Sequence, residues 1–156
     1  MPKRRNAIAM TPEEQEAYLR EPGHTLQVAT IGPAGYPHLV AMNYAVIDGK
    51  IHFTSYAKAQ KVLNLRRDPK ITVMIESGKQ YSDLRGLVIQ GQADIIEGDL
   101  DLAVRVVQGL QAGMEDAHDT ASPTEDAIRT LAKRVVIRVN PVHVYSWDHR
   151  KLGGVY

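Results

Sequence analysis

The strongest structural signal in the sequence is a hairpin turn within Ile47-Asp48-Gly49-Lys50-Ile51. Asp-Gly between two apolar runs is typical of the two-residue turns that join antiparallel strands. A second turn, Gly32-Pro33-Ala34-Gly35, lies before it, and Pro37 starts an extended segment that runs through residue 47. We therefore expect strand 37–47 to pair with a strand that ends near Ser55.

Further strand and helix patterns lie on both sides of this hairpin. Apolar alternation predicts strands, and capping boxes followed by a periodic stretch predict short helices. The long segment 84–96 contains Gly86 and Gly91, which suggest a bulge, a bend or a close backbone approach. Expected strands are residues 24–31, 37–47, 51–55, 70–76, 84–96 and 135–147, and expected helices are residues 12–20, 57–67, 99–110 and 122–134.

The expected strands are mostly consecutive and hairpin-linked, which favours an antiparallel sheet. Six strands with long members and internal glycines favour a closed or split barrel over a flat open sheet. We therefore predict an α+β fold, a six-stranded antiparallel split β-barrel with short flanking helices. Residues 1–10 are expected to be an N-terminal basic arm, and residues 11–156 a single domain.

Composition excludes several classes of protein. The 156 residues include 19 Lys and Arg against 18 Asp and Glu, and a net charge of +1 argues against a dedicated nucleic-acid binder. Cysteine is absent, which excludes disulfide scaffolds, thiolate nucleophiles and Cys-ligated metal sites. Apolar runs such as Val135–Ile137 are too short to span a membrane, and no apolar signal segment follows the basic N-terminus. We expect a cytoplasmic protein with no nucleic-acid or membrane partner.

The most informative stretch for function is the junction Phe53-Thr54-Ser55-Tyr56-Ala57-Lys58-Ala59-Gln60-Lys61, where a strand gives way to a helix. The first amides of a helix lack partners inside it and present the positive end of its dipole. Lys58 and Lys61 are three residues apart, so both are expected on one side of the opening turns, and Thr54 or Ser55 adds a hydroxyl. These groups suit a phosphate. The alternative is a solvated helix face whose lysines bind nothing.

Other chemical signals are weaker. The six histidines form no i,i+4 pair, so no metal site is predicted. The nucleophile elbow and the dinucleotide-binding and P-loop glycine patterns are missing from the sequence. Trp147, which precedes a basic tail, could stack on a planar ligand, sit at a subunit contact, or pack on the core. Tyr81 and Arg85 flank the loop into the long strand and could face a cleft.

Several groups of residues together resemble the pyridoxamine 5′-phosphate oxidase-like split-barrel superfamily, and most closely its actinobacterial branch of flavin/deazaflavin oxidoreductases. They are Val28–Ile31 with Gly35-Tyr36-Pro37-His38, the strand Ile51–Ser55, and Lys58-x-x-Lys61-Val62-Leu63-Asn64-Leu65-Arg66-Arg67-Asp68-Pro69. The later segments Leu84-Arg85-Gly86, Gly91 and residues 147–154 fit the same branch. The resemblance covers about residues 11–154.

The resemblance implies an FMN-binding split barrel with Greek-key connections, which forms a homodimer with a flavin-type cofactor in each of two grooves between subunits. In such proteins the cofactor phosphate lies at the strand-to-helix junction, the ring lies along the second strand, and the partner contributes later strands and its C-terminus. The cofactor-binding residues implied here are Pro37, His38, Leu39, Ala41, Met42, Asn43, Phe53, Thr54, Ser55, Lys58, Lys61, Tyr81, Arg85, Trp147 and Lys151.

The resemblance allows either FMN or the deazaflavin coenzyme F-420, whose tail carries lactate and glutamates. Arg66, Arg67, Lys70 and the segment Lys3-Arg4-Arg5 could supply positive potential for that longer anionic tail, which favours F-420. The implied function is an F-420-dependent reductase that transfers a hydride to a small planar conjugated molecule such as an enone, a quinone or a tetrapyrrole. The catalytic residues are unknown; solvent, Tyr44, Tyr81 or His38 could protonate the product.

Two alternatives stay open from the sequence. The protein could be an FMN oxidase that acts on pyridoxamine phosphate, or a non-catalytic carrier of F-420 or haem. Asn43 stands where many relatives carry a large aromatic residue, and this departure leaves the substrate open.

Overall fold

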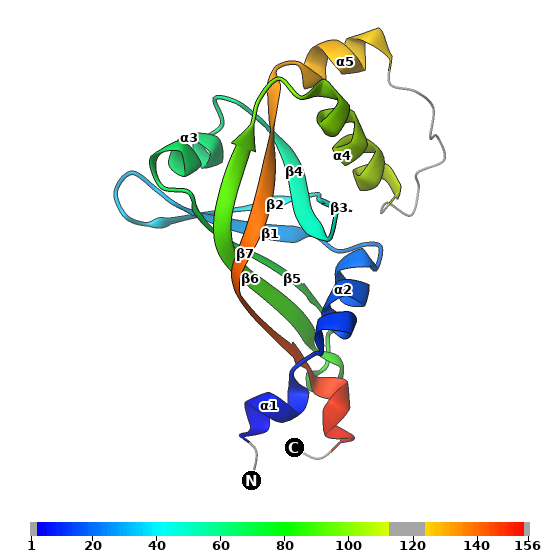
Figure 1. Cartoon of the computed structure of the whole chain (residues 1–156). Helices are drawn as coiled ribbons and strands as arrows, with labels where there is room; N and C mark the ends of the chain where they lie inside the picture. The colour runs from blue at the N-terminus through cyan, green and yellow to red at the C-terminus, as the bar shows by residue number, and fades with distance from the viewer. Residues whose placement is uncertain (1–2, 113–123, 155–156) are drawn as a thin grey trace.

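The computed structural model describes residues 3–112 and 124–154. Within this part of the chain, short helices surround a strongly curved sheet (Figure 1). The helices are α1 (Arg4–Ile8), α2 (Pro12–Arg20), α3 (Gln60–Arg67), α4 (Leu100–Ala112) and α5 (Glu125–Leu131), with 3₁₀ helices η1 (Tyr81–Asp83) and η2 (His149–Leu152). The strands are β1 (Leu26–Ile31), β2 (Pro37–Met42), β3 (Ala45–Ile47), β4 (Lys50–Tyr56), β5 (Lys70–Ser77), β6 (Arg85–Ile96) and β7 (Arg134–Asp148).

The sheet closes on itself because its two edge strands are consecutive in the chain. All strand pairs are antiparallel, in the order β2-β1-β5-β6-β7-β4-β3. Only Asn43 and Tyr44 separate β2 from β3, a link that reaches about 11 Å. A flat sheet of this order would hold the two edges roughly 29 Å apart, so the sheet must curl. The predicted antiparallel split barrel with flanking helices is confirmed.

The described residues contain seven strands, one more than expected, because segment 37–47 is two strands. β2 pairs with β1, whereas β3 pairs with β4, so the chain changes partner at Asn43 and Tyr44. The Tyr44 hydroxyl donates a 2.7 Å hydrogen bond to the carbonyl of Leu19 in α2. This contact helps to fix the break between β2 and β3, and no local sequence pattern predicts that break.

The Asp48-Gly49 turn joins β3 to β4 as predicted. Ile47 lies opposite Lys50, and both turn residues have positive φ, 51° for Asp48 and 73° for Gly49. Positive φ at both central residues is the requirement of the type I′ hairpin turn, whose twist matches that of the strands. The turn pairs β4 with β3, and the other edge of β4, up to the strand-to-helix junction at its end, pairs with β7.

Both glycines of β6 lie where the expected irregularities occur. The β6–β7 register shifts between Gln90 and Gly91, and a Cβ on Gly91 would stand 2.1 Å from the carbonyl oxygen of Asn140. A Cβ on Gly86 would lie 1.9 Å from Cζ2 of Trp147. The expected bulge and close approach are confirmed, and Gly86 makes the room in which the Trp147 ring lies against the sheet.

Replacing Gly86 with valine should therefore displace the Trp147 ring. We expect a loss of about 1–3 kcal/mol of folding free energy, which lowers Tm by roughly 2–10 °C. Because Trp147 is the only tryptophan, its emission spectrum reports the displacement directly. Gln92→Val, at an exposed position of the same strand, is the matched control. An unchanged emission spectrum and Tm in Gly86→Val would contradict the close contact.

Two apolar clusters hold the fold together. The larger lies inside the barrel, and the smaller lies between β3, the first part of β7, α4 and α5 (Figure 1). A Cβ on Gly109 would lie 2.7 Å from that of Ala45, so α4 comes very close to β3. The fully buried members of the larger cluster include Leu26, Val28, Phe53, Val62 and Ile137; the smaller consists of Ala45, Ile47, Ala103, Val106, Leu131 and Val136.

The helix after β4 begins at Gln60, not at Ala57 as expected. Ala57 and Lys58 form a turn, closed by a 3.0 Å hydrogen bond from the Ala59 amide to the Tyr56 carbonyl. Lys58 therefore precedes the helix, and only Lys61 lies in its first turn. The expectation that both lysines occupy the opening turns of a helix was wrong for Lys58.

The other helix ends follow local signals. Thr11 and Glu14 form the expected capping box, and Asp99 accepts a hydrogen bond from the Leu102 amide at the start of α4. Thr124 caps α5; the expected start at residues 122–123 lies outside the described residues. α5 ends before residue 134 because β7 begins there, and the expected basic arm contains α1. Across the described ranges, no helix is long and apolar enough to cross a membrane.

Candidate functional site

The end of β4 and the start of α3 meet beside the first residues of β7. Thr54 and Ser55 are both buried, and side chains alternate along a strand. Ser55 therefore faces the barrel interior, on the same side as Phe53, whereas Thr54 faces the smaller cluster, opposite Val136. The Phe53 side chain is fully buried in the larger cluster, so only its backbone could contact a ligand.

Three cations surround this junction. Arg134 lies opposite Tyr56 in the β4–β7 register; its guanidinium stands 4.3 Å from the centroid of the Tyr56 ring, and its Nη1 donates to Thr54 Oγ1 at 3.4 Å. Burial lowers the pKa of Lys61, and the neighbouring charge of Arg134 lowers it further. Lys58 is exposed in the preceding turn. We call Lys58, Lys61 and Arg134, with Thr54, the cationic corner; the Ser55 side chain points to the other face of β4.

No cation of this corner forms an ion pair with another described residue. Elsewhere in the protein cations typically face carboxylates: Arg138 contacts Asp94 at 2.8 Å, and Arg150 contacts Asp148 at 2.6 Å. Two neighbouring cations, one of them half-buried, destabilise each other unless an anion compensates them. The arrangement therefore suits an external anion that brings its own negative charge and several acceptor oxygens.

The other basic residues of α3, and Lys70 at the start of β5, are already engaged. Arg66 forms an ion pair with Glu97, Arg67 donates to the carbonyl of Ile31, and Lys70 lies 4.0 Å from Asp68. These contacts reduce the positive potential that the sequence suggested for a cofactor tail.

The β2 residues divide between the two faces of the sheet. His38 and Met42 face the barrel interior, opposite Thr30 and Leu26 of β1, whereas Pro37, Leu39 and Ala41 are exposed on the outer face. Asn43 is exposed at the break that follows. The Nδ1 atom of His38 is buried and has no hydrogen-bond partner among the described residues. β2 thus offers an uncharged outer surface and one unsatisfied polar atom on its inner side.

The four remaining expected residues lie at the C-terminal end of β7. Arg85 binds Glu21 through two hydrogen bonds of 2.8 and 2.9 Å, which lower the pKa of the Glu21 carboxyl. Lys151 binds Glu14 at 2.6 Å. Trp147 lies against Gly86, and the Tyr81 ring meets the His149 ring edge-on, with centroids 4.5 Å apart. Arg85 and Lys151 are therefore neutralised within their own chain.

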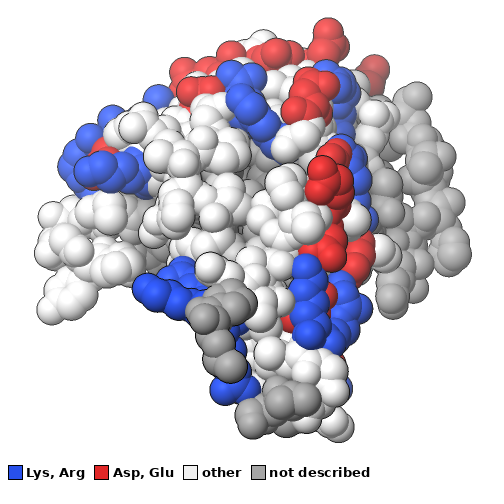
Figure 2. All heavy atoms as spheres, turned by 60° about the horizontal axis from the view of Figure 1, so that its bottom comes forward, with Lys and Arg blue, Asp and Glu red and all other residues white. Residues whose placement is uncertain are grey.

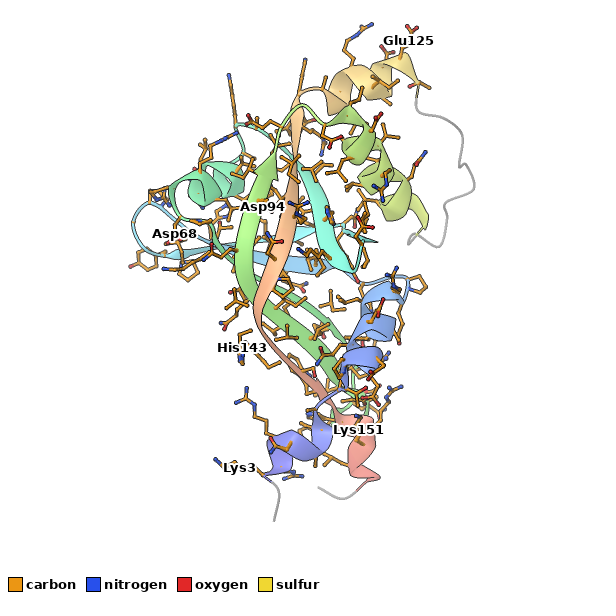
Figure 3. The ribbon with its side chains drawn as sticks, viewed as in Figure 1. Lys3, Asp68, Asp94, Glu125, His143 and Lys151 are labelled. Atoms are coloured by element: carbon orange, nitrogen blue, oxygen red, sulfur yellow. The ribbon has the colours of Figure 1, made fainter. Side chains whose placement is uncertain are left out.

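One chain does not bring all the expected residues together. It gathers Thr54, Ser55, Lys58 and Lys61 at the start of β7, whereas Trp147 lies near the other end of this 15-residue strand. At about 3.3 Å per residue, roughly 40 Å of strand lies between the two ends. In Figure 3, Asp68, which follows α3, and Lys151 lie in different parts of the molecule. A single cofactor could meet both groups only if a second copy supplied one of them.

Sequence reasoning missed Arg134, which has no motif around it and lies 80 residues from Thr54. It also left Tyr44 as a possible proton donor. The structure commits the Tyr44 hydroxyl to the carbonyl of Leu19, and burial raises its pKa. Within the described residues, no three His, Asp or Glu side chains gather to hold a metal ion.

A curled antiparallel sheet with a few flanking helices is the architecture of the split-barrel proteins. The family model described as pyridoxamine 5′-phosphate oxidase matches residues 11–148. The chain therefore belongs to the pyridoxamine 5′-phosphate oxidase-like split-barrel family, which includes oxidoreductases and flavin-binding proteins. The resemblance seen in the sequence is confirmed.

Solved structures agree with this assignment. The conserved hypothetical protein Rv2991 from Mycobacterium tuberculosis is 38% identical, with a TM-score of 0.88 over 99% of this chain and 94% of that one. A structure described as an F-420 reductase is 27% identical, with a TM-score of 0.64 over 86% of this chain and 98% of that one. The haem storage protein HutZ from Vibrio cholerae, 18% identical with a TM-score of 0.65 over 90% and 99%, shares the fold alone. No curated protein matches the sequence.

Proposed function

We propose that this protein is a coenzyme F-420-dependent oxidoreductase that transfers a hydride from the reduced coenzyme to a planar conjugated acceptor, such as an enone, a quinone or a tetrapyrrole. The observation that carries the proposal is the cationic corner, where Lys61 and Arg134 lie close together without a carboxylate partner among the described residues. The similarity to a structure described as an F-420 reductase supports the choice of cofactor.

In this proposal the corner holds the cofactor phosphate. Lys61 and Arg134 supply formal positive charge, Lys58 adds a third cation, and the first amides of α3 donate hydrogen bonds. The Thr54 hydroxyl already accepts from Arg134, so it orients the guanidinium toward the anion. Burial is the main cause of the lowered pKa of Lys61, and an anion at this point would relieve the added repulsion from Arg134. The residues present therefore fit a phosphate.

The ring would lie along β2, on the side of the exposed residues Pro37, Leu39 and Ala41. When bound, a reduced deazaflavin supplies the hydride, so the task of the chain is to orient the ring against the acceptor and to exclude water. The outward face of β2 carries no ionised side chain that would hold water over the ring. Asn43, exposed at the end of β2, is placed to contact the acceptor substrate.

A second copy would complete the groove. Two rows of side chains cross the outer face of five strands in register, one through Leu39, Ala29, Thr72, Gln90 and His143, the other through Ala41, Gln27, Met74, Val88 and Tyr145. Within the single chain Val88 is already buried, and the Arg5 guanidinium lies 5.6 Å from the centroid of the Tyr145 ring, so the first row is the more open of the two. These ten positions hold no Asp, Glu, Lys or Arg, and such depletion is typical of the centre of a subunit interface. We propose that two copies meet on this face, so that Trp147 and Tyr81 of one reach the corner of the other.

The family match also favours a second candidate, an FMN-binding protein that acts on pyridoxamine phosphate. Both candidates use the same corner for a phosphate, so the difference lies in the ring system that is bound. If the protein is this FMN-binding candidate, the purified protein would be yellow and would release peroxide with the amine as substrate.

Parallel titrations of the apoprotein with F-420 and FMN, followed by difference spectra, test the proposal. We expect F-420 to bind at least tenfold more tightly than FMN. The reduced coenzyme should then be reoxidised when a quinone is added, at a rate proportional to the protein concentration. Tighter binding of FMN would support the second candidate, and tight F-420 binding without turnover across enones and quinones would contradict the enzyme.

A further inference from the structure

Tyr56, at the end of β4, is an exposed aromatic residue to which the proposed function gives no role. Its side chain is fixed in place although Tyr56 is 50% exposed. Tyr56 lies opposite Arg134 in the β4–β7 ladder, and its carbonyl accepts a 3.0 Å hydrogen bond from the Ala59 amide in the turn that follows. The Tyr56 hydroxyl has no hydrogen-bond partner among the described residues. The part of this side chain that has a partner is therefore the ring.

The partner of the Tyr56 ring is the guanidinium of Arg134. Residues directly opposite each other in two antiparallel strands point to the same side of the sheet, so both side chains share a face with Thr54. The guanidinium carbon stands 4.3 Å from the ring centroid, within the ~6 Å over which a ring face attracts an arginine. The Arg134 Nη1 atom also donates to Thr54 Oγ1 at 3.4 Å. The ring and the hydroxyl thus hold the guanidinium at two points.

This hold acts against a repulsion inside the cationic corner. Burial lowers the pKa of Lys61 most, and the charge of Arg134 lowers it further, so the two cations are close enough to repel each other. Elsewhere cations lie among acids, as the Lys and Arg side chains on the right of Figure 2 do. An arginine that is free to rotate would move its charge away from Lys61 into solvent. The attraction of the Tyr56 ring opposes that movement.

We propose that Tyr56 is a positioning residue, whose ring keeps the Arg134 guanidinium beside Lys61 so that both cations meet the cofactor phosphate without rearrangement. This role rests on the proposed phosphate site, because Tyr56 acts only through Arg134. A long side chain loses rotamer freedom when a ligand fixes it, and a side chain that is already fixed loses less, so the ring strengthens binding. The role requires an aromatic ring and no hydroxyl.

A double-mutant cycle, with the apoprotein titrated with F-420, tests this role. We expect Tyr56→Leu to weaken binding about three- to tenfold, the range that a partly exposed contact between a cation and a ring face supports. Tyr56→Phe is the matched control, and it should bind as tightly as the parent chain. When Arg134 is already alanine, Tyr56→Leu should weaken binding no further, because the ring then has no guanidinium to hold.

A second measurement uses the apoprotein alone. NMR titration of the Lys61 side chain follows its pKa, which the nearby charge of Arg134 lowers in addition to burial. In Tyr56→Leu the released guanidinium should move away, so the pKa of Lys61 should rise toward its ordinary value, by no more than it rises in Arg134→Ala. Tyr56→Phe should leave the pKa lowered. A ring that served only as packing would not separate the leucine variant from the phenylalanine variant in this way.

The outcomes distinguish the role of Tyr56 from the function itself. If Arg134→Ala binds F-420 as tightly as the parent chain, the phosphate site and the role of Tyr56 both fail. If Arg134→Ala weakens binding but Tyr56→Leu does not, the corner stands and the role is overturned. Equal losses from Tyr56→Leu with and without Arg134, or equal losses in the leucine and phenylalanine variants, also overturn it. Tm confirms the fold of each variant, and Tyr56→Thr, which suits a strand, replaces the leucine variant if leucine lowers Tm.

Discussion

Replacing Lys61 and Arg134 together by alanine is expected to weaken cofactor binding on the order of a hundredfold, with little change in Tm. Each charge-assisted hydrogen bond to a phosphate contributes about 1.5–3 kcal/mol, and a loss of about 3 kcal/mol corresponds to that factor. We expect the lower end of the range because Lys61 is only half-buried. Adding Lys58→Ala should weaken binding further. Fold stability should change little, because neither substitution removes an ion pair with a described carboxylate.

Equilibrium titration with F-420, followed by absorbance, measures the effect. Lys133→Ala is the matched control, since Lys133 is an exposed cation next to Arg134 and lies outside the corner. If the double variant binds the cofactor as tightly as the parent chain, the phosphate does not lie at the corner. A parallel loss of Tm would instead show that the two cations are needed for folding.

The same assignment has a pH signature. Burial and Arg134 hold the pKa of Lys61 below its ordinary value of 10.5 in the free protein. A bound phosphate favours the charged amine and raises that pKa, so binding is strongest while Lys61 is protonated. Affinity should be constant near neutral pH and fall as pH rises through the lowered pKa of the free protein. Lys61→Arg, which stays charged, should flatten this decline.

Local sequence signals predicted most of the fold. The Asp48-Gly49 turn and the Thr11 capping box were predictable because a few neighbouring residues decide such structures. Gly86 and Gly91 indicated the irregular β6 because a missing Cβ is useful only where another group comes close. The split barrel followed from these strands and from the resemblance to a family.

The cationic corner was only half predictable. Lys58 and Lys61 lie in the motif after β4, but Arg134 enters through the pairing of β4 with β7, and a single sequence does not reveal such pairing. The same limit applies to Arg85 and Lys151. Each looked available for a ligand, yet each binds a carboxylate of the N-terminal region, Glu21 and Glu14 respectively. The sequence shows which residues are charged, but it does not show which of them form ion pairs in the fold.

The largest remaining prediction concerns the two separated halves of the site. If Trp147 of one copy completes the corner of the other, a chain with Lys61→Ala and Arg134→Ala should be rescued by a chain with Trp147→Leu. Each variant alone has two defective grooves. In the mixed dimer one groove carries both defects, whereas the other is built entirely from unaltered residues. After random exchange about half of the dimers are mixed, so about a quarter of all grooves should bind F-420 with the parent affinity.

Two differently tagged chains make this experiment quantitative, because affinity purification on both tags isolates the mixed dimer, in which half of the grooves should be intact. The rescue cannot arise if the groove is built within one chain, since every groove then keeps a defect. Isolated mixed dimers without recovered binding would therefore refute the shared groove while leaving the cationic corner untouched. A parent chain that elutes as a monomer would refute the dimer itself. Trp147→Leu keeps an apolar side chain against Gly86, so the C-terminal end of β7 should stay folded in every combination.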